Sequence, residues 1–204
     1  MKRVDGIKWG FYLAFRILLV AAGAYALYKK DWLNFGLAVI TVMLTFVPPL
    51  FEKRFKVDYP SEFEIAIIIF LFTSIYLGGI RDYYYKIWWW DVILHTFSGV
   101  IIGMIGFSLV SLLNREKELA IHLPPAFVAI FSFSFAIAIG AMWEIFEFAM
   151  DSFFGFNMQK SGLVDTMWDL IVDALGALVV CVLGYFYLKK DPQLFERMEK
   201  VFLK

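Results

Sequence analysis

Long apolar stretches alternate with short polar ones along the whole chain, and six of the apolar stretches are long enough to cross a bilayer. A membrane-spanning helix needs about 17–25 mostly apolar residues. These stretches lie near residues 7–28, 32–50, 61–79, 91–113, 125–150 and 163–188. The pattern predicts an all-α protein, a polytopic membrane helix bundle with six transmembrane helices, in a single domain that covers residues 1–190.

The tail after this domain, residues 191–204, has a different pattern. Its apolar residues fall on one helical face and its Glu and Lys residues on the other. That arrangement is typical of a helix that lies on a membrane surface. We therefore predict a short C-terminal amphipathic helix at the cytoplasmic interface.

Composition supports a membrane protein. The chain has 204 residues, of which 61% are hydrophobic and 19% are charged, whereas soluble domains are about 45–50% apolar and roughly a quarter charged. The formal net charge is zero, which argues against a nucleic acid as partner. A single cysteine, Cys181, cannot form a disulfide within the chain. Membrane lipids are the expected partners, and the sequence leaves the oligomeric state open.

Basic residues are distributed unequally between the two sets of loops. One side holds 13 Lys and Arg residues and includes both termini, while the other side holds five, namely Lys29, Lys30, Arg81, Lys86 and Lys160. Cytoplasmic loops carry an excess of Lys and Arg. This asymmetry predicts that both termini are cytoplasmic.

Carboxylates inside the apolar stretches are the most informative residues, because charged groups are costly in a bilayer and mark functional sites. They form three stripes at helical spacing: Asp91 with His95; Glu144, Glu147 and Asp151; and Asp165, Asp169 and Asp173. All three stripes lie at the same, extracytoplasmic end of their helices. A rise of about 1.5 Å per residue puts His95, Glu144 and Asp169 at similar depth, roughly 7–10 Å below the helix ends.

Several carboxylates in a low-dielectric pocket must be protonated, paired with cations or bound to metal. One imidazole among many carboxylates suits Mg²⁺, Mn²⁺, Ca²⁺ or Fe²⁺, and can also hold Zn²⁺. We therefore predict a divalent metal ion as cofactor. The predicted ligands are His95, Glu144, Asp169, Asp173 and Asp151, and the predicted catalytic bases or supporting groups are Asp91, Glu147 and Asp165. Small residues such as Gly99 and Gly103 would let the helices approach closely.

A purely structural network is the alternative interpretation. Asp165 and Asp151 lie at helix ends, where an acid can have a simple capping role. Arg16 lies near the middle of the first stretch and needs a partner, and Asp173 is at similar depth. This alternative predicts that Arg16 contacts Asp173 or another acid of the stripes.

The runs WWWDVILHTFSG, AMWEIFEFAMD and NMQKSGLVDTMWDLIVDALGA resemble the YjdF-like family of bacterial and archaeal inner-membrane proteins. A weaker similarity connects Asp91, His95 and the final Asp-rich helix to VanZ-like proteins of the cell envelope. The resemblance implies a multi-pass protein of the cytoplasmic (inner) membrane and adds Gln159 to the motif positions. It implies no particular activity.

Three functions compete at this stage. The first is a metal-dependent enzyme acting on a lipid or lipid-linked head group, in which the metal polarises a phosphoryl or carbonyl oxygen. The second is a cation or small-solute transporter with the acids along its path. The third is a non-catalytic envelope protein with a structural ion. The polar residues are concentrated on one side, and the chain shows no inverted repeat of the kind found in many transporters, which favours a site over a transmembrane path.

Overall fold

The computed structural model describes residues 2–55, 61–113 and 123–190, and within these ranges it is helical with no strand. Six helical segments are long and apolar enough to cross a membrane: Gly6–Lys29, Trp32–Arg54, Ser61–Ile80, Trp90–Val110, Pro125–Phe154 and Leu163–Lys190. This confirms the all-α fold class and the six predicted spans. The predicted amphipathic tail, residues 191–204, lies outside the described residues.

The helices form two compact units, one ending at Trp90 and the other beginning at Asp91. The first contains α1 (Lys2–Lys29), α2 (Trp32–Leu44), α3 (Val47–Phe55), α4 (Ser61–Leu71), the π-helix η1 (Phe72–Ile80) and α5 (Tyr83–Lys86). The second contains nearly all of α6 (Trp90–Leu113), and α7 (Pro125–Phe154) and α8 (Leu163–Lys190). Each unit is described by itself below.

In the first unit, the second span is broken between α2 and α3 because of two consecutive prolines. Pro48 and Pro49 have no N–H, so the carbonyls of Leu44 and Thr45 lose their usual helical donors. The chain turns at Thr45 and Phe46, and α3 then carries both prolines in its first turn, where a missing N–H costs nothing.

Arg16 supplies a replacement donor for the carbonyl that Pro49 leaves free. Its Nη2 donates to the Thr45 carbonyl oxygen at 3.1 Å and its Nε to the Thr45 hydroxyl at 2.9 Å. Its guanidinium also lies 3.8 Å from the centroid of the Phe46 ring. Within the first unit, Arg16 thus bonds the backbone of a broken helix and packs on an aromatic ring, while its pairing with an acid of the stripes stays a prediction.

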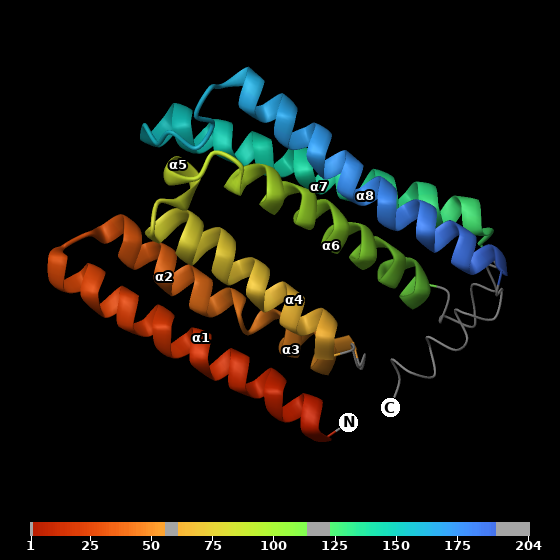
Figure 1. Ribbon diagram of the computed structural model, residues 1–204, viewed down its shortest axis with the longest axis horizontal. Helices are drawn as coiled ribbons and strands as arrows, with labels where there is room; N and C mark the ends of the chain where they lie inside the picture. The colour runs from red at the N-terminus through yellow and green to blue at the C-terminus, as the bar shows by residue number, and fades with distance from the viewer. Residues whose placement is uncertain (1, 56–60, 114–122, 191–204) are drawn as a thin grey trace. The chain divides into compact units, whose positions relative to one another are not determined.

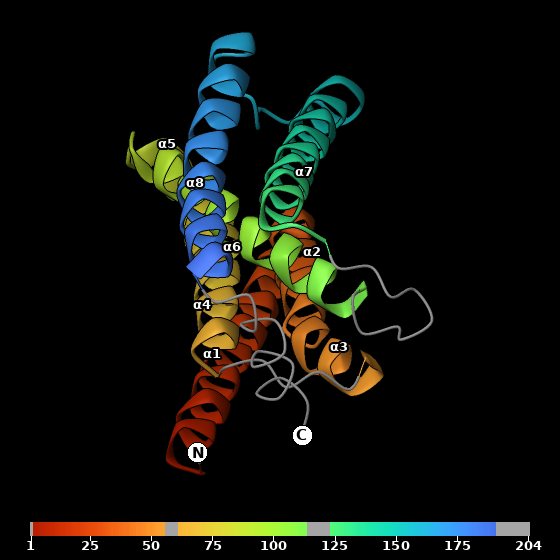
Figure 2. The same cartoon turned by 90° about the vertical axis from the view of Figure 1, so that its right-hand side faces the viewer.

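In the second unit, α7 and α8 form an antiparallel hairpin with α6 packed beside it (Figure 1). Figure 2 shows the end at which residues 155–162 join the two helices. The buried residues of α7 recur about every four positions, which gives one continuous stripe: Val128, Ser132, Ala136, Gly140, Glu144 and Glu147. The opposite faces of α7 and α8 expose large apolar side chains, such as Ile130, Ile145, Val179 and Leu183, as expected for surfaces that meet lipid.

The buried stripe changes character along the hairpin. Towards the end of α6 and α8, Val110, Val128 and Leu188 form an apolar core with Phe107, Leu123 and Phe131. Towards the 155–162 connection, the buried positions carry carboxylates and one imidazole. The polar residues of this unit thus gather at one end, which is the candidate site.

Candidate functional site

His95 is the central residue of the polar end, and its ring is held in a fixed orientation. It lies on the second turn of α6 and only 8% of its surface is exposed. Its Nδ1 lies 3.1 Å from Asp173 Oδ2 on α8, and the other oxygen of Asp173 accepts a hydrogen bond from the Ser98 hydroxyl. Ligating histidines commonly bond a carboxylate through the nitrogen that does not bind the metal. Asp173 therefore orients the imidazole so that Nε2 is available on its other edge.

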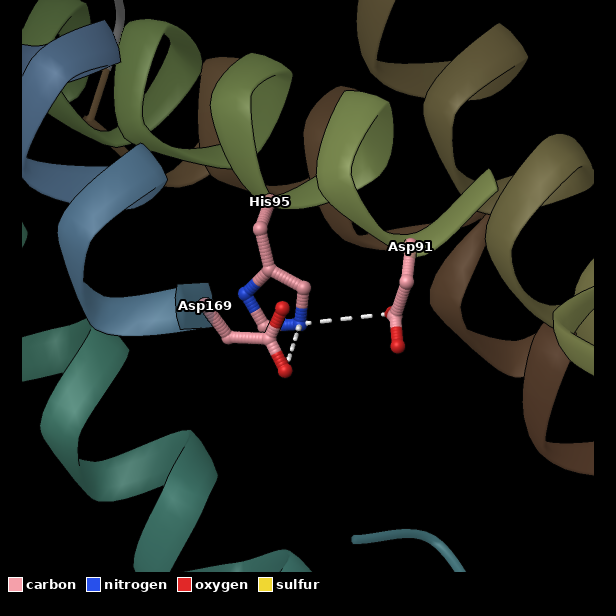
Figure 3. A group of neighbouring side chains, drawn as sticks. All are labelled: Asp91, His95 and Asp169. Carbon is pink, nitrogen blue, oxygen red and sulfur yellow. Dashed lines mark ion pairs between the residues drawn. The ribbon is translucent and has the colours of Figure 1, made fainter. Parts of the chain in front are cut away.

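Two carboxylates face this Nε2 atom (Figure 3). Asp91 Oδ1, one turn earlier on α6, lies 3.6 Å away, and Asp169 Oδ2 on α8 lies 4.0 Å away. The ligand atoms of the three residues lie within 4.8 Å of one another. Nitrogen and oxygen ligands at 2.0–2.1 Å from a tetrahedral zinc ion are about 3.4 Å apart, so these separations suit groups that surround a cation better than groups that bond each other.

Three of the acids have buried oxygens without a hydrogen-bond partner among the described residues. These are Oδ2 of Asp169, which is 3% exposed, both carboxylate oxygens of Glu144, which is 4% exposed, and Oδ2 of Asp165. Thr166 is a polar neighbour of Glu144 but makes no hydrogen bond of normal geometry with it. Leaving such oxygens buried and unpaired costs free energy, so we expect them to be protonated or to bind a cation.

Glycines allow α6 and α8 to come close enough for the three groups to meet. A Cβ atom on Gly99 of α6 would overlap the carbonyl oxygen of Asp173, and one on Gly176 of α8 would overlap the carbonyl oxygen of Thr96. On α7, a Cβ on Gly140 would lie 2.8 Å from Asp173 Oδ2. The small-residue pattern read from the sequence thus lies at the helix contacts around Asp173.

The connection between α7 and α8 is shaped by Asp151. Its Oδ1 accepts from the backbone N–H of Met158 at 2.7 Å and its Oδ2 from that of Gln159 at 2.9 Å. Gly155 ends α7 in the left-handed conformation, with φ of 70°, which glycine adopts without strain. Asp151 was predicted as a metal ligand, but here both of its oxygens bind loop backbone.

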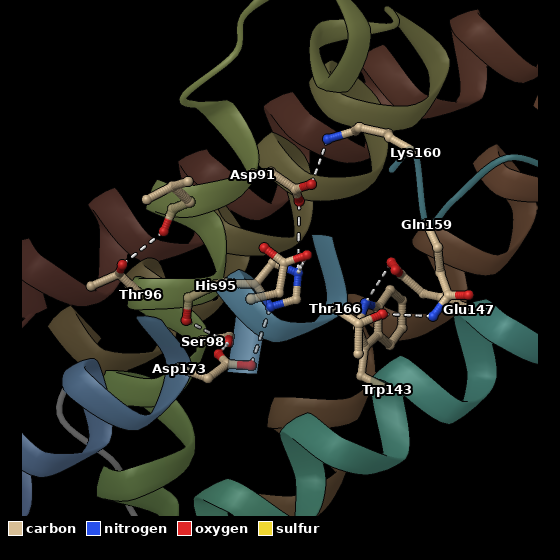
Figure 4. A network of polar contacts seen from close by, with 12 residues as sticks. Asp91, His95, Thr96, Ser98, Trp143, Glu147, Gln159, Lys160, Thr166 and Asp173 are labelled. Atoms are coloured by element: carbon tan, nitrogen blue, oxygen red, sulfur yellow. Dashed lines mark hydrogen bonds and ion pairs between the residues drawn. The ribbon is translucent and has the colours of Figure 1, made fainter. Parts of the chain in front are cut away.

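The same connection places further polar side chains beside the cluster (Figure 4). Lys160 forms an ion pair with Asp91. The Gln159 side-chain amide donates to the Thr166 hydroxyl at 2.7 Å. Glu147, on α7, accepts from the indole N–H of Trp143 at 2.9 Å and is 8% exposed.

The structure therefore brings together His95, Asp169 and Asp91, with Asp173 behind the imidazole. Asp91, predicted as a base, has the geometry of a ligand, while Asp173, predicted as a ligand, binds the ring nitrogen of His95. Three contributors were not among the predicted site residues: Ser98, Trp143 and Lys160. For Lys160 a signal existed, since it is the one basic residue in a loop flanked by acidic stripes.

Comparison with known proteins gives a family but no activity. A family model described as "predicted membrane protein (DUF2238)" matches residues 7–190. An uncharacterised protein of Thermotoga maritima is 30% identical over 153 residues, which cover 74% of this chain and 76% of that protein. No solved structure matches the chain significantly.

Proposed function

The chain belongs to the DUF2238 family of predicted membrane proteins, and from that premise we propose that its buried cluster is a binding site for a divalent metal ion. His95, Asp91 and Asp169 supply the ligands, and Asp173 fixes the imidazole. The resemblance to the YjdF-like family agrees with this membership, while the similarity to VanZ-like proteins stays a prediction.

One observation carries the proposal. His95 is bonded through Nδ1, and its Nε2 faces two carboxylate oxygens at 3.6 and 4.0 Å, one of which is buried without a hydrogen-bond partner. A hydrogen-bonded network would be expected to close these gaps, whereas a cation between the groups needs them. One imidazole with carboxylate oxygens is a hard ligand set, which suits Mn²⁺, Fe²⁺, Mg²⁺ or Zn²⁺.

The position of the cluster supports an action on head groups. Asp91 is in the first turn of α6, next to a segment rich in Tyr and Trp, residues 83–90. Such aromatic belts sit at the membrane–water interface, which supports a site near the depth of lipid head groups. There a metal would polarise a phosphoryl or carbonyl oxygen and activate a bound water. We propose a metal-dependent enzyme that acts on a lipid or lipid-linked head group.

Metal analysis of the purified protein tests the site. We expect the wild-type chain to retain a divalent ion, and His95→Ala and Asp169→Asn to lose most of it and to melt at lower temperature, because bound metal stabilises the folded state. Ser132→Ala is the control, since Ser132 is buried on α7 but bonds only the Val128 carbonyl among the interactions described for it. A metal-free wild-type protein of full stability would leave the structural network as the better explanation.

We further propose that both termini are cytoplasmic and that the membrane is the inner one. The basis is the excess of Lys and Arg on one side of the spans. In a Cys181→Ala background, Lys86→Cys should react with an impermeant thiol reagent added outside intact cells. Arg54→Cys should react only after the cells are opened. The opposite labelling pattern would reverse the orientation.

A further inference from the structure

Glu144 lies opposite Asp169, although it is not one of the three groups that meet at His95 Nε2. The contact of Gly140 with the Asp173 carboxylate fixes the register of the α7–α8 hairpin. One turn from there towards the connection, α7 presents Glu144 and antiparallel α8 presents Asp169. One further turn brings Glu147 and Asp165 to the same level. The two helices thus offer paired layers of carboxylate.

The unpaired oxygens of the unit are concentrated in these layers. Among the described residues, buried carboxylate oxygens without a partner belong to Glu144, Asp165 and Asp169. The neighbouring acids are engaged instead: Asp173 by His95 and Ser98, Asp151 by loop backbone, and Glu147 by Trp143. Glu144 is only 4% exposed, so its carboxylate lies inside the unit and not against lipid.

The carboxylates at the polar end of the second unit carry enough potential negative charge for more than one divalent cation. Besides Asp151, which binds loop backbone, six acids lie at this end of the unit: Asp91, Glu144, Glu147, Asp165, Asp169 and Asp173. The basic partners described there are Lys160 and, if protonated, His95. A single divalent ion would offset two charges and require His95 to be neutral, so the remaining carboxylates at this end must be protonated or bind a further cation. Uncompensated buried charge is strongly unfavourable.

We propose that Glu144 and Asp165 hold a second divalent cation beside the first, with the Asp169 carboxylate between the two ions. This rests on the proposed function, because the first ion is the one at His95. Among the described residues, Asp91, His95 and Asp169 are the one group of three whose ligand atoms lie within 4.8 Å of one another. Cations such as Mg²⁺ and Mn²⁺ bind through one or two protein carboxylates and complete their shell with water, so the second ion would reach part of its ligands through water.

A pair of metal ions narrows the substrate class. Two ions about 3.5–4 Å apart clamp the attacking and leaving oxygens of an in-line displacement at phosphorus. Paired ions also serve aminopeptidases, but a lipid head group offers a phosphate ester, so the proposed substrate is a phosphate ester, carried either by a lipid head group or by a soluble molecule.

The metal-to-protein ratio tests the second ion. Protein purified with Mn²⁺ should contain two ions per chain, and Glu144→Gln should contain one, because the amide removes the charge that holds the second ion but leaves Asp91, His95 and Asp169 in place. Asp82→Asn is the matched control: it makes the same acid-to-amide change at an exposed residue of the first unit and should retain two. The electron paramagnetic resonance spectrum should show coupled manganese in the wild type and isolated manganese in Glu144→Gln.

The possible outcomes separate the two proposals. One ion per wild-type chain overturns the second site and leaves the first standing, while no ion overturns both. If Glu144→Gln retains two ions, or loses both while still folded, the second position is not at Glu144 and the inference fails. Should Glu144→Gln not fold, Asp165→Asn carries the same expectation. Release of phosphate from phosphatidic acid in vesicles, compared with a soluble phosphate monoester, distinguishes the two sources of substrate.

Discussion

Replacing Lys8 by methionine is expected to destabilise the protein by about 3–5 kcal/mol, because it leaves a buried carboxylate without its cation. Lys8 of α1 forms an ion pair with Glu64 of α4, and the two residues are 8% and 1% exposed. The Tyr12 hydroxyl donates to the other oxygen of Glu64 at 3.0 Å. The free energy of unfolding, measured by denaturant titration in detergent micelles, checks the expected loss.

The double variant Lys8→Met/Glu64→Leu is the control for this prediction. Replacing both partners of a buried pair by apolar residues of similar size is often neutral or stabilising. The double variant should therefore recover most of the stability that the single variant loses, and the difference gives the coupling free energy. If the single and double variants are equally unstable, the loss reflects packing of the Lys8 stem and not the buried charge.

The first unit shows what length and hydropathy can and cannot predict. Six spans follow from apolar runs of bilayer length, and their positions were predicted to within a few residues. The partner of Arg16 was not, because the search was for an opposite charge. Its actual partner is a carbonyl oxygen that the helix itself would normally satisfy, and it becomes free only because Pro49 cannot donate. Predicting this partner of Arg16 would require the proline positions and the tertiary contacts to be considered together.

The π-helix η1 is a second feature that no sequence period indicated. Its residues, Phe72–Ile80, are as apolar as those of the preceding α4. The π-helix occurs where α5 packs on η1. The Tyr84 ring of α5 lies so close to Gly78 of η1 that a Cβ atom on Gly78 would overlap the ring. The helix propensity of these residues therefore could not predict the π-helix, because this conformation occurs together with a contact between α5 and η1.

For the site, the sequence predicted which helices contribute and at which end, because helical spacing decides which side chains share a face. It could not assign the role of each carboxylate. Asp151 and Asp165 occupy similar positions in their stripes, yet loop backbone engages both oxygens of Asp151, while Oδ2 of Asp165 stays buried and unpaired. Such differences depend on the path of the connection, residues 155–162, which carries no periodic signal.

Replacing Gly99 by alanine is expected to destabilise the second unit by about 1–3 kcal/mol and to lower its metal content. The new methyl group would overlap the carbonyl oxygen of Asp173, and a backbone atom in a packed helix cannot move aside without cost. Pushing α8 away there would displace Asp173 from His95 and draw Asp169 away from Asp91. Thermal unfolding and bound metal should therefore fall together.

Gly103→Ala makes the identical change one turn further along α6 and should have the opposite effect. A Cβ at Gly103 would lie 3.7 Å from its nearest neighbour, the Ala177 Cα, which is ordinary contact, and alanine favours the helix by about 0.8–1.0 kcal/mol over glycine. Gly176→Ala, on the facing helix, should repeat the loss seen for Gly99→Ala, because its methyl group would meet the Thr96 carbonyl. If Gly99→Ala melts at a lower temperature but keeps its full metal content, the α6–α8 contact stabilises the fold without setting the distance between the ligands. Equal behaviour of Gly99→Ala and Gly103→Ala would mean instead that the two helices are not in contact at Gly99.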